Sequence, residues 1–207
     1  MEILTNDYQY AIFTAFFILM MGCALGSVVA FEQPKMMENA QHIYGQSIVN
    51  TTYSNVEAQV IQETLPIWVG VGLFVIILLL NNLFIATLVV FLPRYIDGWL
   101  GILSVSYLLF SLGFIPGMLF TRVASAIGVS YSIVAFVPHG VFEFAGVIVA
   151  GGLGYYYLMK NDKEDKSELK KKLNNTYLHV VVPLIILASV VEVFITPFVE
   201  AMILTGI

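Results

Sequence analysis

Apolar residues in this chain gather in long unbroken runs that are separated by polar stretches. The runs occupy residues 8–31, 67–92, 99–120, 138–157 and 178–204. Each run reaches the roughly 20 residues that an α-helix needs to cross the hydrocarbon core of a bilayer. Strands of a membrane barrel would instead alternate over segments of about 10 residues. The pattern predicts an all-α, polytopic helical membrane protein with about five transmembrane helices, in a single transmembrane domain over 1–207.

One further apolar stretch, residues 124–137, is too short for a comfortable crossing. We expect it to form an interfacial or half-inserted helix. The fourth span then begins near Pro138, because proline suits the first turn of a helix. This span ends at the tyrosines of residues 155–157, which are typical of an aromatic belt at the membrane interface. Pro183 and Pro197 are expected to kink the last span.

Lysines predict the orientation in the membrane. The segment 159–177 carries six lysines, whereas 32–66 carries only Lys35. Since basic residues favour the cytoplasmic side, 159–177 is predicted to be a cytoplasmic lysine-rich loop and 32–66 an extracytoplasmic loop. In the cell membrane the N-terminus then lies in the cytoplasm and the C-terminus outside. Asn50 begins an Asn-Thr-Thr sequon on the outer side, where it is a candidate for glycosylation.

The composition agrees with a membrane protein and excludes several other classes. Hydrophobic residues make up 59% of the chain and charged residues 11%, with a net charge of -5, whereas soluble domains are nearer a quarter charged. The single cysteine, Cys23, excludes an intrachain disulfide. No nucleotide-binding or nucleophile motif is present, and basic residues cluster only where acidic ones interleave. We therefore expect no cofactor and no nucleic-acid partner; the overall pattern would suit an archaeal protein.

Small residues recur at four-residue spacing in three of the predicted spans. Such faces let helix backbones approach closely in lipid. They are interpreted as helix-packing surfaces, either within one chain or between subunits, with a substrate groove as the alternative. The residues are Gly22, Gly26, Gly113, Gly117, Gly146, Ala150 and Gly154.

His139 and Glu143 are the main candidates for chemistry. They stand four residues apart and therefore share one helix face. Ionisable groups at membrane depth are costly and usually point inward or toward a cavity. Three interpretations remain open: a hydrogen-bonded structural clamp, a proton or ion relay, and a metal site in which the pair supplies two ligands and other residues the rest.

Other polar residues are predicted to lie within the spans. Asn81 and Asn82 stand in the middle of the second span, where unpaired amides are expensive. Glu192 lies near the middle of the last span and is a candidate to pair with Arg122 or His139. We expect these side chains to converge on one internal polar core.

Three features resemble the stage II sporulation protein M family of bacterial and archaeal membrane proteins. They are the asparagine pair inside a span, a glycine-rich third span, and the run PHGVFEFAGVIVAGGLG. The resemblance implies a shared polar core of Asn81, Asn82, His139, Gly140 and Glu143. It also implies a role within a membrane assembly, because members from sporulating bacteria act with a peptidoglycan-degrading partner during engulfment.

The favoured function is a membrane scaffold or assembly component without catalytic activity, which contacts the lipid bilayer and forms a homo-oligomer or joins a membrane complex. The alternative is a component of a transporter or channel that moves a proton, ion or solute past the His, Glu and Asn side chains. A metal-dependent membrane enzyme is a third hypothesis, with His139 and Glu143 as ligands.

Overall fold

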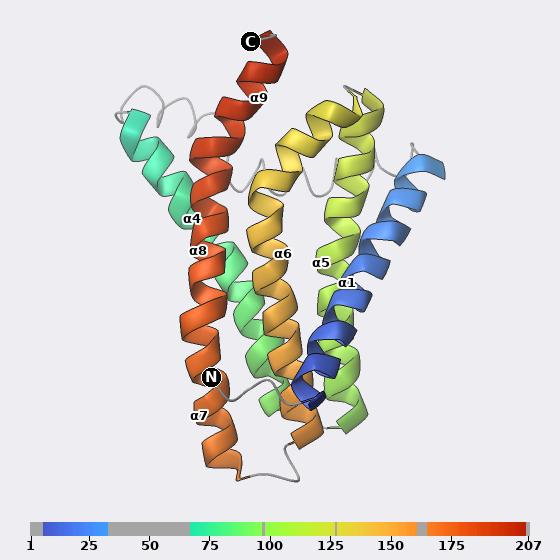
Figure 1. Ribbon diagram of the computed structural model, residues 1–207, viewed down its shortest axis with the longest axis vertical. Coiled ribbons are helices and arrows are strands. Elements are labelled where there is room, and N and C mark those ends of the chain that lie inside the picture. Colours follow the sequence, from blue (N-terminus) through green and yellow to red (C-terminus); the bar gives the residue numbers. More distant parts are fainter. Residues whose placement is uncertain (1–5, 33–66, 97, 127, 161–164, 206–207) are drawn as a thin grey trace, which may run out of the picture.

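The computed structural model describes residues 6–32, 67–96, 98–126, 128–160 and 165–205. Every element in these ranges is helical (Figure 1), and the all-α prediction is confirmed. The elements in chain order are α1 (Asn6–Glu32), α4 (Ile67–Phe91), η1 (Leu92–Arg94), α5 (Gly98–Ala126), α6 (Val129–Lys160), α7 (Lys166–Thr176), η2 (Tyr177–Val181), α8 (Val182–Val190), η3 (Val191–Ile195) and α9 (Thr196–Thr205).

Five helices in the described part of the chain are long and apolar enough to cross a membrane. They are Asn6–Glu32, Val75–Arg94, Gly98–Ala126, Val129–Lys160 and the continuous helix Lys166–Val199. Large apolar side chains on their outer surfaces are exposed, including Leu80 at 61% and Phe84 at 63%. A bilayer solvates such a surface, whereas water does not. The five-span membrane prediction is therefore confirmed.

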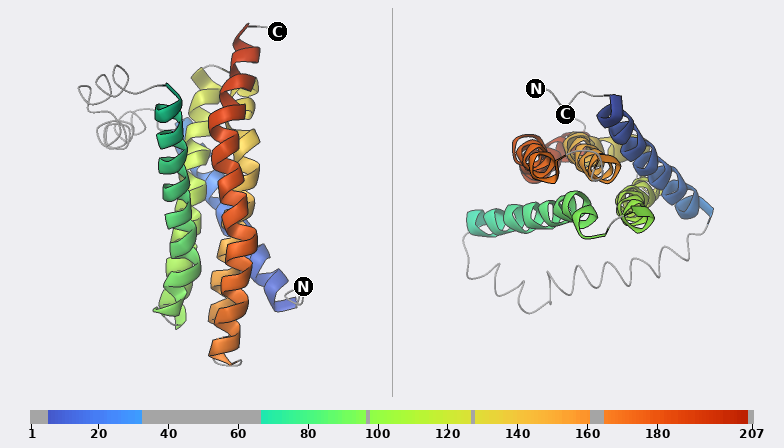
Figure 2. Two further views of the ribbon diagram at one scale, coloured as in Figure 1. Left: turned by 90° about the vertical axis from the view of Figure 1, so that its left-hand side faces the viewer. Right: turned by 90° about the horizontal axis from the view of Figure 1, so that it is seen from below.

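Helix α6 occupies the centre of the bundle. It packs against α1, α5, α4 and α8, and α9 contacts its first part. Figures 1 and 2 show α6 beside the long C-terminal helix, with α1 and α4 inclined to the other spans. Residues that extend from α6 therefore reach every other part of the bundle.

The closest helix contact joins α1 to α5 through four of the predicted small residues, Gly22, Gly26, Gly113 and Gly117. A methyl group built on any of them would collide with a backbone carbonyl oxygen of the opposite helix. A methyl on Gly113, for example, would meet the carbonyl of Leu19. These four glycines form an internal glycine contact, in which the two backbones touch because neither has side chains in the way.

The small residues of α6 also face the interior of the same chain. A methyl group on Gly146 would lie 3.0 Å from Ile185 Cδ1 of α8, and one on Gly154 would lie 2.6 Å from the Val89 carbonyl oxygen of α4. Ala150 is fully buried. Of the interpretations given for these faces, the structure therefore displays packing within the chain.

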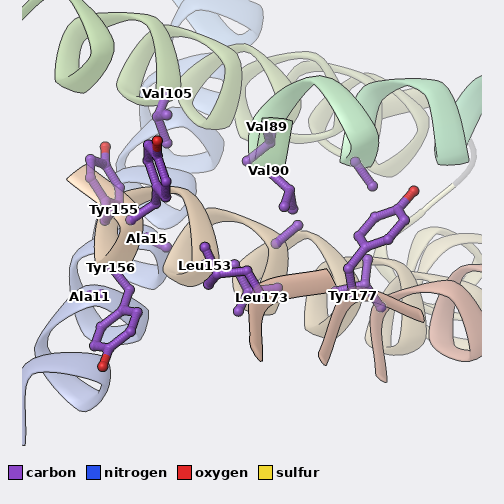
Figure 3. Packing of buried hydrophobic residues seen from close by; sticks show 14 of the residues in the cluster. Ala11, Ala15, Val89, Val90, Val105, Leu153, Tyr155, Tyr156, Leu173 and Tyr177 are labelled. Atoms are coloured by element: carbon purple, nitrogen blue, oxygen red, sulfur yellow. The ribbon is translucent and has the colours of Figure 1, made fainter. Parts of the chain in front are cut away.

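The tyrosines of 155–157 differ from their prediction as an interfacial belt. All three are buried, with Tyr157 only 3% exposed, and Figure 3 shows Tyr155 and Tyr156 within the core. The Tyr155 hydroxyl lies 2.7 Å from Ser106 Oγ. The Tyr156 ring packs edge-on against Tyr8 at 5.6 Å. Burial is tolerated because a buried tyrosine needs only a partner for its hydroxyl and an apolar surround for its ring.

The chain also differs from prediction over 124–137. Instead of a separate half-inserted helix, its first residues complete α5 and residues 129–137 form the first turns of α6. Pro138 lies inside α6 rather than at its start, and Figure 1 shows the helix bent in this region. Proline removes one hydrogen bond, but neighbouring helices let a membrane span tolerate that loss.

In the last span, both prolines follow a widened helical turn. Val182 N–H donates to the Tyr177 carbonyl, five residues back, and Pro183 comes next. Thr196 N–H donates to the Val191 carbonyl in the same way, and Pro197 comes next. A π-helical turn of this kind lets the chain continue past a residue without an N–H. The result is one continuous helix with two π-turns.

Two polar contacts join four chain segments at one end of the bundle. Lys160 Nζ pairs with the Asp7 carboxylate at 2.6 Å, which joins the start of α1 to the end of α6. Arg94 Nη2 donates to Asn174 Oδ1 at 2.7 Å, which joins the α4–α5 turn to α7. The C-terminal end of α9 lies at the opposite end (Figure 1).

The predicted loops are only partly described. Much of 159–177 is helical, since α7 begins after Asp165, whose side chain accepts the Ser167 N–H at 2.8 Å. Leu169 and Leu173 of α7 are buried in the core. The predicted extracytoplasmic loop 32–66 and the sequon at Asn50 lie outside the described residues, apart from Glu32.

Candidate functional site

The candidate site lies where α6 meets the second π-turn of the last span. His139 and Glu143 stand one turn apart on α6. Glu192 belongs to η3 and Thr196 begins α9. His139 Nδ1 lies 3.3 Å from Thr196 Oγ1, and which of the two donates depends on the imidazole tautomer. These four residues are named the polar cluster.

The π-turn positions the residues that the last span contributes. Thr196 Oγ1 donates to the Val191 carbonyl at 3.3 Å, and the Thr196 N–H donates to the same oxygen. The hydroxyl is thereby held beside the helix backbone, where His139 reaches it. Such π-turns occur frequently at functional sites. The sequence signal for Thr196, which the sequence analysis missed, is its position one turn after Glu192.

In the part of the chain that the structure describes, no cation pairs with either carboxyl group of the polar cluster. Glu143 follows His139 by one turn of α6, and Glu192 precedes Thr196 by one turn of the antiparallel last span, so the two carboxyl groups lie at a similar level of the bundle. Among the described residues, neither forms a hydrogen bond or an ion pair, so the predicted pairing of Glu192 with Arg122 does not appear there. An apolar surround with two carboxyl groups and one imidazole suits a proton, a cation or a neutral hydrogen-bond donor.

A pocket of about 440 Å³ adjoins the polar cluster. His139, Gly140 and Glu143 form part of its α6 wall. Its remaining walls come from α1 and α5 and are mostly apolar. His139 and Glu143 therefore both line this pocket, and His139 also contacts the last span.

Asn81 and Asn82 do not join the polar cluster. Asn81 Nδ2 donates to Asn82 Oδ1 at 3.3 Å, and Asn81 is exposed on the outer face of α4. Thr87, five residues further along, meets the Tyr177 hydroxyl at 2.6 Å. Counting about 1.5 Å per residue from that contact, Asn82 and Glu192 are roughly 15 Å apart along the bundle. The expected single polar core is instead two separate groups.

The polar cluster offers few possible ligands for a metal ion. Within the described ranges, no three His, Cys, Asp or Glu side chains gather closely enough to hold a metal ion. His139 and Glu143 supply two potential ligands on one helix face, whereas zinc sites use three or four protein ligands. The geometry therefore offers no complete ligand set in this part of the chain.

A comparison with models of known protein families gave a match. The family model described as Stage II sporulation protein M matches residues 13–197. This range includes every residue of the polar cluster and the asparagine pair. No curated protein and no solved structure matches the chain.

Proposed function

Because the chain belongs to the stage II sporulation protein M family, we propose that it is a non-catalytic assembly component of a membrane complex. It would bind a partner transmembrane helix through the outer face of α4. No catalytic step is assigned to it: the Thr196 hydroxyl beside His139 donates its proton to the Val191 carbonyl rather than to a base, and Glu143 contacts no hydroxyl or thiol among the described residues.

The observation that carries this proposal is the asparagine pair of α4, in which Asn81 is exposed and Asn82 is half-buried. Their mutual hydrogen bond leaves an Asn81 oxygen and the Asn82 amino group available as acceptor and donor. Lipid tails satisfy neither, and asparagine side chains hydrogen-bond across helices in membranes. Figure 2 shows α4 inclined away from the other spans toward its N-terminal end, and Asn81 is among the exposed residues of this helix.

The apolar neighbours of the asparagine pair provide the rest of the contact surface. Ile77, Leu80 and Phe84 lie on the same stretch of α4 and are all exposed. A partner helix with its own amide or hydroxyl would pair with Asn81 while it packs against these side chains. The glycine faces are not needed for this contact, since they are already used within the chain.

The orientation that we propose places the lysine-rich end in the cytoplasm. Lys160, Arg94 and α7 lie at one end of the bundle, and basic residues favour the cytoplasmic side. The N-terminal end of α1 would then face the cytoplasm, and the C-terminus would face outward.

Cysteine cross-linking in native membranes tests the proposal. In a Cys23→Ser background, a cysteine at Leu80 should form a disulfide with a second copy or a cross-link with another membrane protein. Asn81→Leu should reduce that yield. The control is Ser104→Ala on α5, an exposed hydroxyl that already donates to the Leu100 carbonyl at 2.8 Å. If Leu80→Cys yields no cross-linked species, or Asn81→Leu has no more effect than the control, the assembly role is wrong.

A second candidate function is passage of protons or small cations past the polar cluster. It is favoured by one observation: two carboxyl groups and an imidazole lie where two spans, α6 and the last span, meet at a π-turn. Purified protein in liposomes with an internal pH-sensitive dye provides the test. Proton flux that is abolished by both Glu143→Gln and Glu192→Gln would support transport. Equal dye traces with and without the protein would eliminate it.

A further inference from the structure

The exposed residues of α4 form a regular pattern in the part of the helix that carries Asn81. Between residues 72 and 84 they fall in adjacent pairs that repeat every four positions. Residues four apart are neighbours on the surface of a helix, so the pairs form two parallel ridges, which together are named the α4 ridge face. One ridge consists of Gly72, Ile76, Leu80 and Phe84, and the other of Leu73, Ile77 and Asn81.

The spacing of these ridges indicates the kind of helix that would cover them. Ridges of residues four apart interdigitate with ridges of the same spacing on a second helix, and the two axes then cross at about −50°. Right-handed crossings of about −40° are common between membrane helices. A left-handed coiled coil would instead bury a seam with an average spacing of 3.5 residues, namely 73, 77, 80 and 84, and would place Asn81 beside that seam. The α4 ridge face, with Asn81 included, therefore fits a helix that presents the same pattern.

Asn81 lies at a depth where lipid tails, rather than water, surround its exposed side. It precedes Arg94 by 13 residues, or about 20 Å of helix, and Arg94 bonds to Asn174 at the lysine-rich end of the bundle. The hydrocarbon core is roughly 30 Å thick. An amide without partners is costly at such a depth.

The amide of Asn81 has one acceptor and one donor left to satisfy. Its Nδ2 donates one hydrogen to Asn82 Oδ1 at 3.3 Å, and a primary amide carries a second hydrogen on the same nitrogen. Its Oδ1 accepts no hydrogen bond from the described residues. A partner that satisfies Asn81 must therefore both accept and donate at this one position.

A second copy of this chain meets these requirements. Copies of a membrane protein insert in the same orientation, so a two-fold axis along the membrane normal brings identical faces together with each residue at the depth of its counterpart. Two Asn81 amides on such an axis complement each other, because each nitrogen donates to the oxygen of the other. Helix α4 contains no charged residue, and no like charges meet across the axis.

We propose that two copies of this chain pair through the α4 ridge face, with reciprocal hydrogen bonds between their Asn81 side chains. The helices cross near Ile77, Leu80 and Asn81. Six residues from a crossing of about −40°, the two axes are displaced sideways by roughly 6 Å, so Gly72 lies at the margin of the contact. This inference rests on the proposed assembly role, and it names the partner that the role requires.

Energy transfer between labelled copies tests the proposal. Full-length protein in a Cys23→Ser background carries Ser167→Cys, an exposed position at the lysine-rich end. One batch is labelled with a donor dye and another with an acceptor dye, and both are reconstituted into the same vesicles. Copies in one orientation place both labels at the same end of the bundle. Transfer should therefore appear without any other protein, and its decrease on dilution with lipid gives a dissociation constant.

Substitutions in the α4 ridge face should weaken the pair. Asn81→Leu should raise the dissociation constant roughly tenfold, or about 1.4 kcal/mol, and Asn81→Gln, which keeps a donor and an acceptor, should raise it less. Ile77→Trp should also raise it, whereas Leu103→Trp on α5 should not, although the two original side chains are 50% and 54% exposed. Equal effects of the two tryptophan variants would refute the α4 ridge face as the contact surface.

Mixed pairs test whether the two asparagines bind each other. A pair of one unaltered copy and one Asn81→Leu copy should dissociate at least as readily as a pair in which both copies carry leucine, because one substitution already removes both reciprocal bonds. A mixed pair with an intermediate dissociation constant would mean that Asn81 bonds to a different group of the partner, and the reciprocal bond would be wrong.

The outcome for the assembly role is read separately. No energy transfer between unaltered copies would refute a second copy as the partner. The assembly role would survive that result if Leu80→Cys forms a cross-link with a different membrane protein in native membranes, and it would fail with it if no cross-link forms.

Discussion

Gly113→Ala should weaken the packing of α1 against α5 even though it adds only one methyl group. The methyl would collide with the Leu19 carbonyl oxygen and lie 3.0 Å from the Cys23 backbone nitrogen. Both are backbone atoms, so no side chain can rotate away. Helix α1 must instead move outward along its contact with α5.

The size of the effect follows from the geometry. Restoring the Cys23 distance from 3.0 Å to an ordinary contact of about 3.4 Å moves α1 by at least about 0.4 Å. A gap of 0.5–1 Å forfeits about a quarter to a half of the dispersion energy of each atom pair. Overpacking of this kind costs about 1–3 kcal/mol. Replacing glycine by alanine also stabilises a helix by about 1 kcal/mol in itself, and this gain offsets part of the loss. The effect of the clash is therefore measured against another Gly→Ala variant that has the same gain and no clash.

Gly72→Ala on α4 and Gly140→Ala on α6 provide that reference, since an added methyl meets nothing at either position. Thermal unfolding in mild detergent should place Gly113→Ala about 1–3 kcal/mol below both, or roughly 2–12 °C in melting temperature for a chain of this size. If the three variants melt together, the α1–α5 backbones do not touch as the structure shows, and the role of the glycine contact is refuted.

Three more predictions concern the end of the bundle near Lys160. Thr87→Val removes the hydrogen-bond partner that lies 2.6 Å from the Tyr177 hydroxyl, and it should lower the free energy of unfolding by about 1–2 kcal/mol. The control is Thr14→Val, which removes an exposed hydroxyl that bonds only to its own helix and should cost almost nothing. Asp7→Asn breaks the ion pair with Lys160 and should lower the free energy of unfolding by less than about 1 kcal/mol. This difference should disappear at high salt, because salt screens exposed charges. A larger loss that does not depend on salt would contradict a surface ion pair. In a Cys23→Ser background, Ser167→Cys should react with a membrane-impermeant maleimide only in inverted vesicles, and labelling of intact cells would reverse the proposed orientation.

The spans themselves follow from the sequence because a bilayer imposes a length and a composition on each crossing. The predicted second span of 67–92 differs from α4, at Ile67–Phe91, by one residue. The first span differs little more, since α1 is Asn6–Glu32. The predicted bounds are wrong where a helix continues beyond the membrane core. In those places a polar residue or a proline lies within the helix and does not mark its start or end. Residues 129–137 and α7 are the examples.

Burial of the tyrosines could not be predicted from their neighbours in the sequence. Residues 155–157 precede Lys160, as an interfacial belt would, but the partners that bury them lie far away in the chain. Ser106 shares a hydrogen bond with the Tyr155 hydroxyl, and Tyr8 packs against the ring of Tyr156. Only the tertiary arrangement of α1, α5 and α6 brings these residues together (Figure 3).

The glycines of α6 show the same limit more sharply. Gly140 and Gly146 stand on one helix, within one apolar run, and no rule of spacing separates them. Gly146 lies against Ile185, so its missing side chain brings two helices together. Gly140 faces empty space within the pocket, so its missing side chain keeps the helix wall back from a cavity. The difference arises from Pro138, which bends α6 just before Gly140 and leaves the later turns straight against α8. A proline followed closely by a glycine at membrane depth therefore indicates two physical effects together, a change of helix direction and the room that the change creates. In this chain the two ionisable residues His139 and Glu143 border that room.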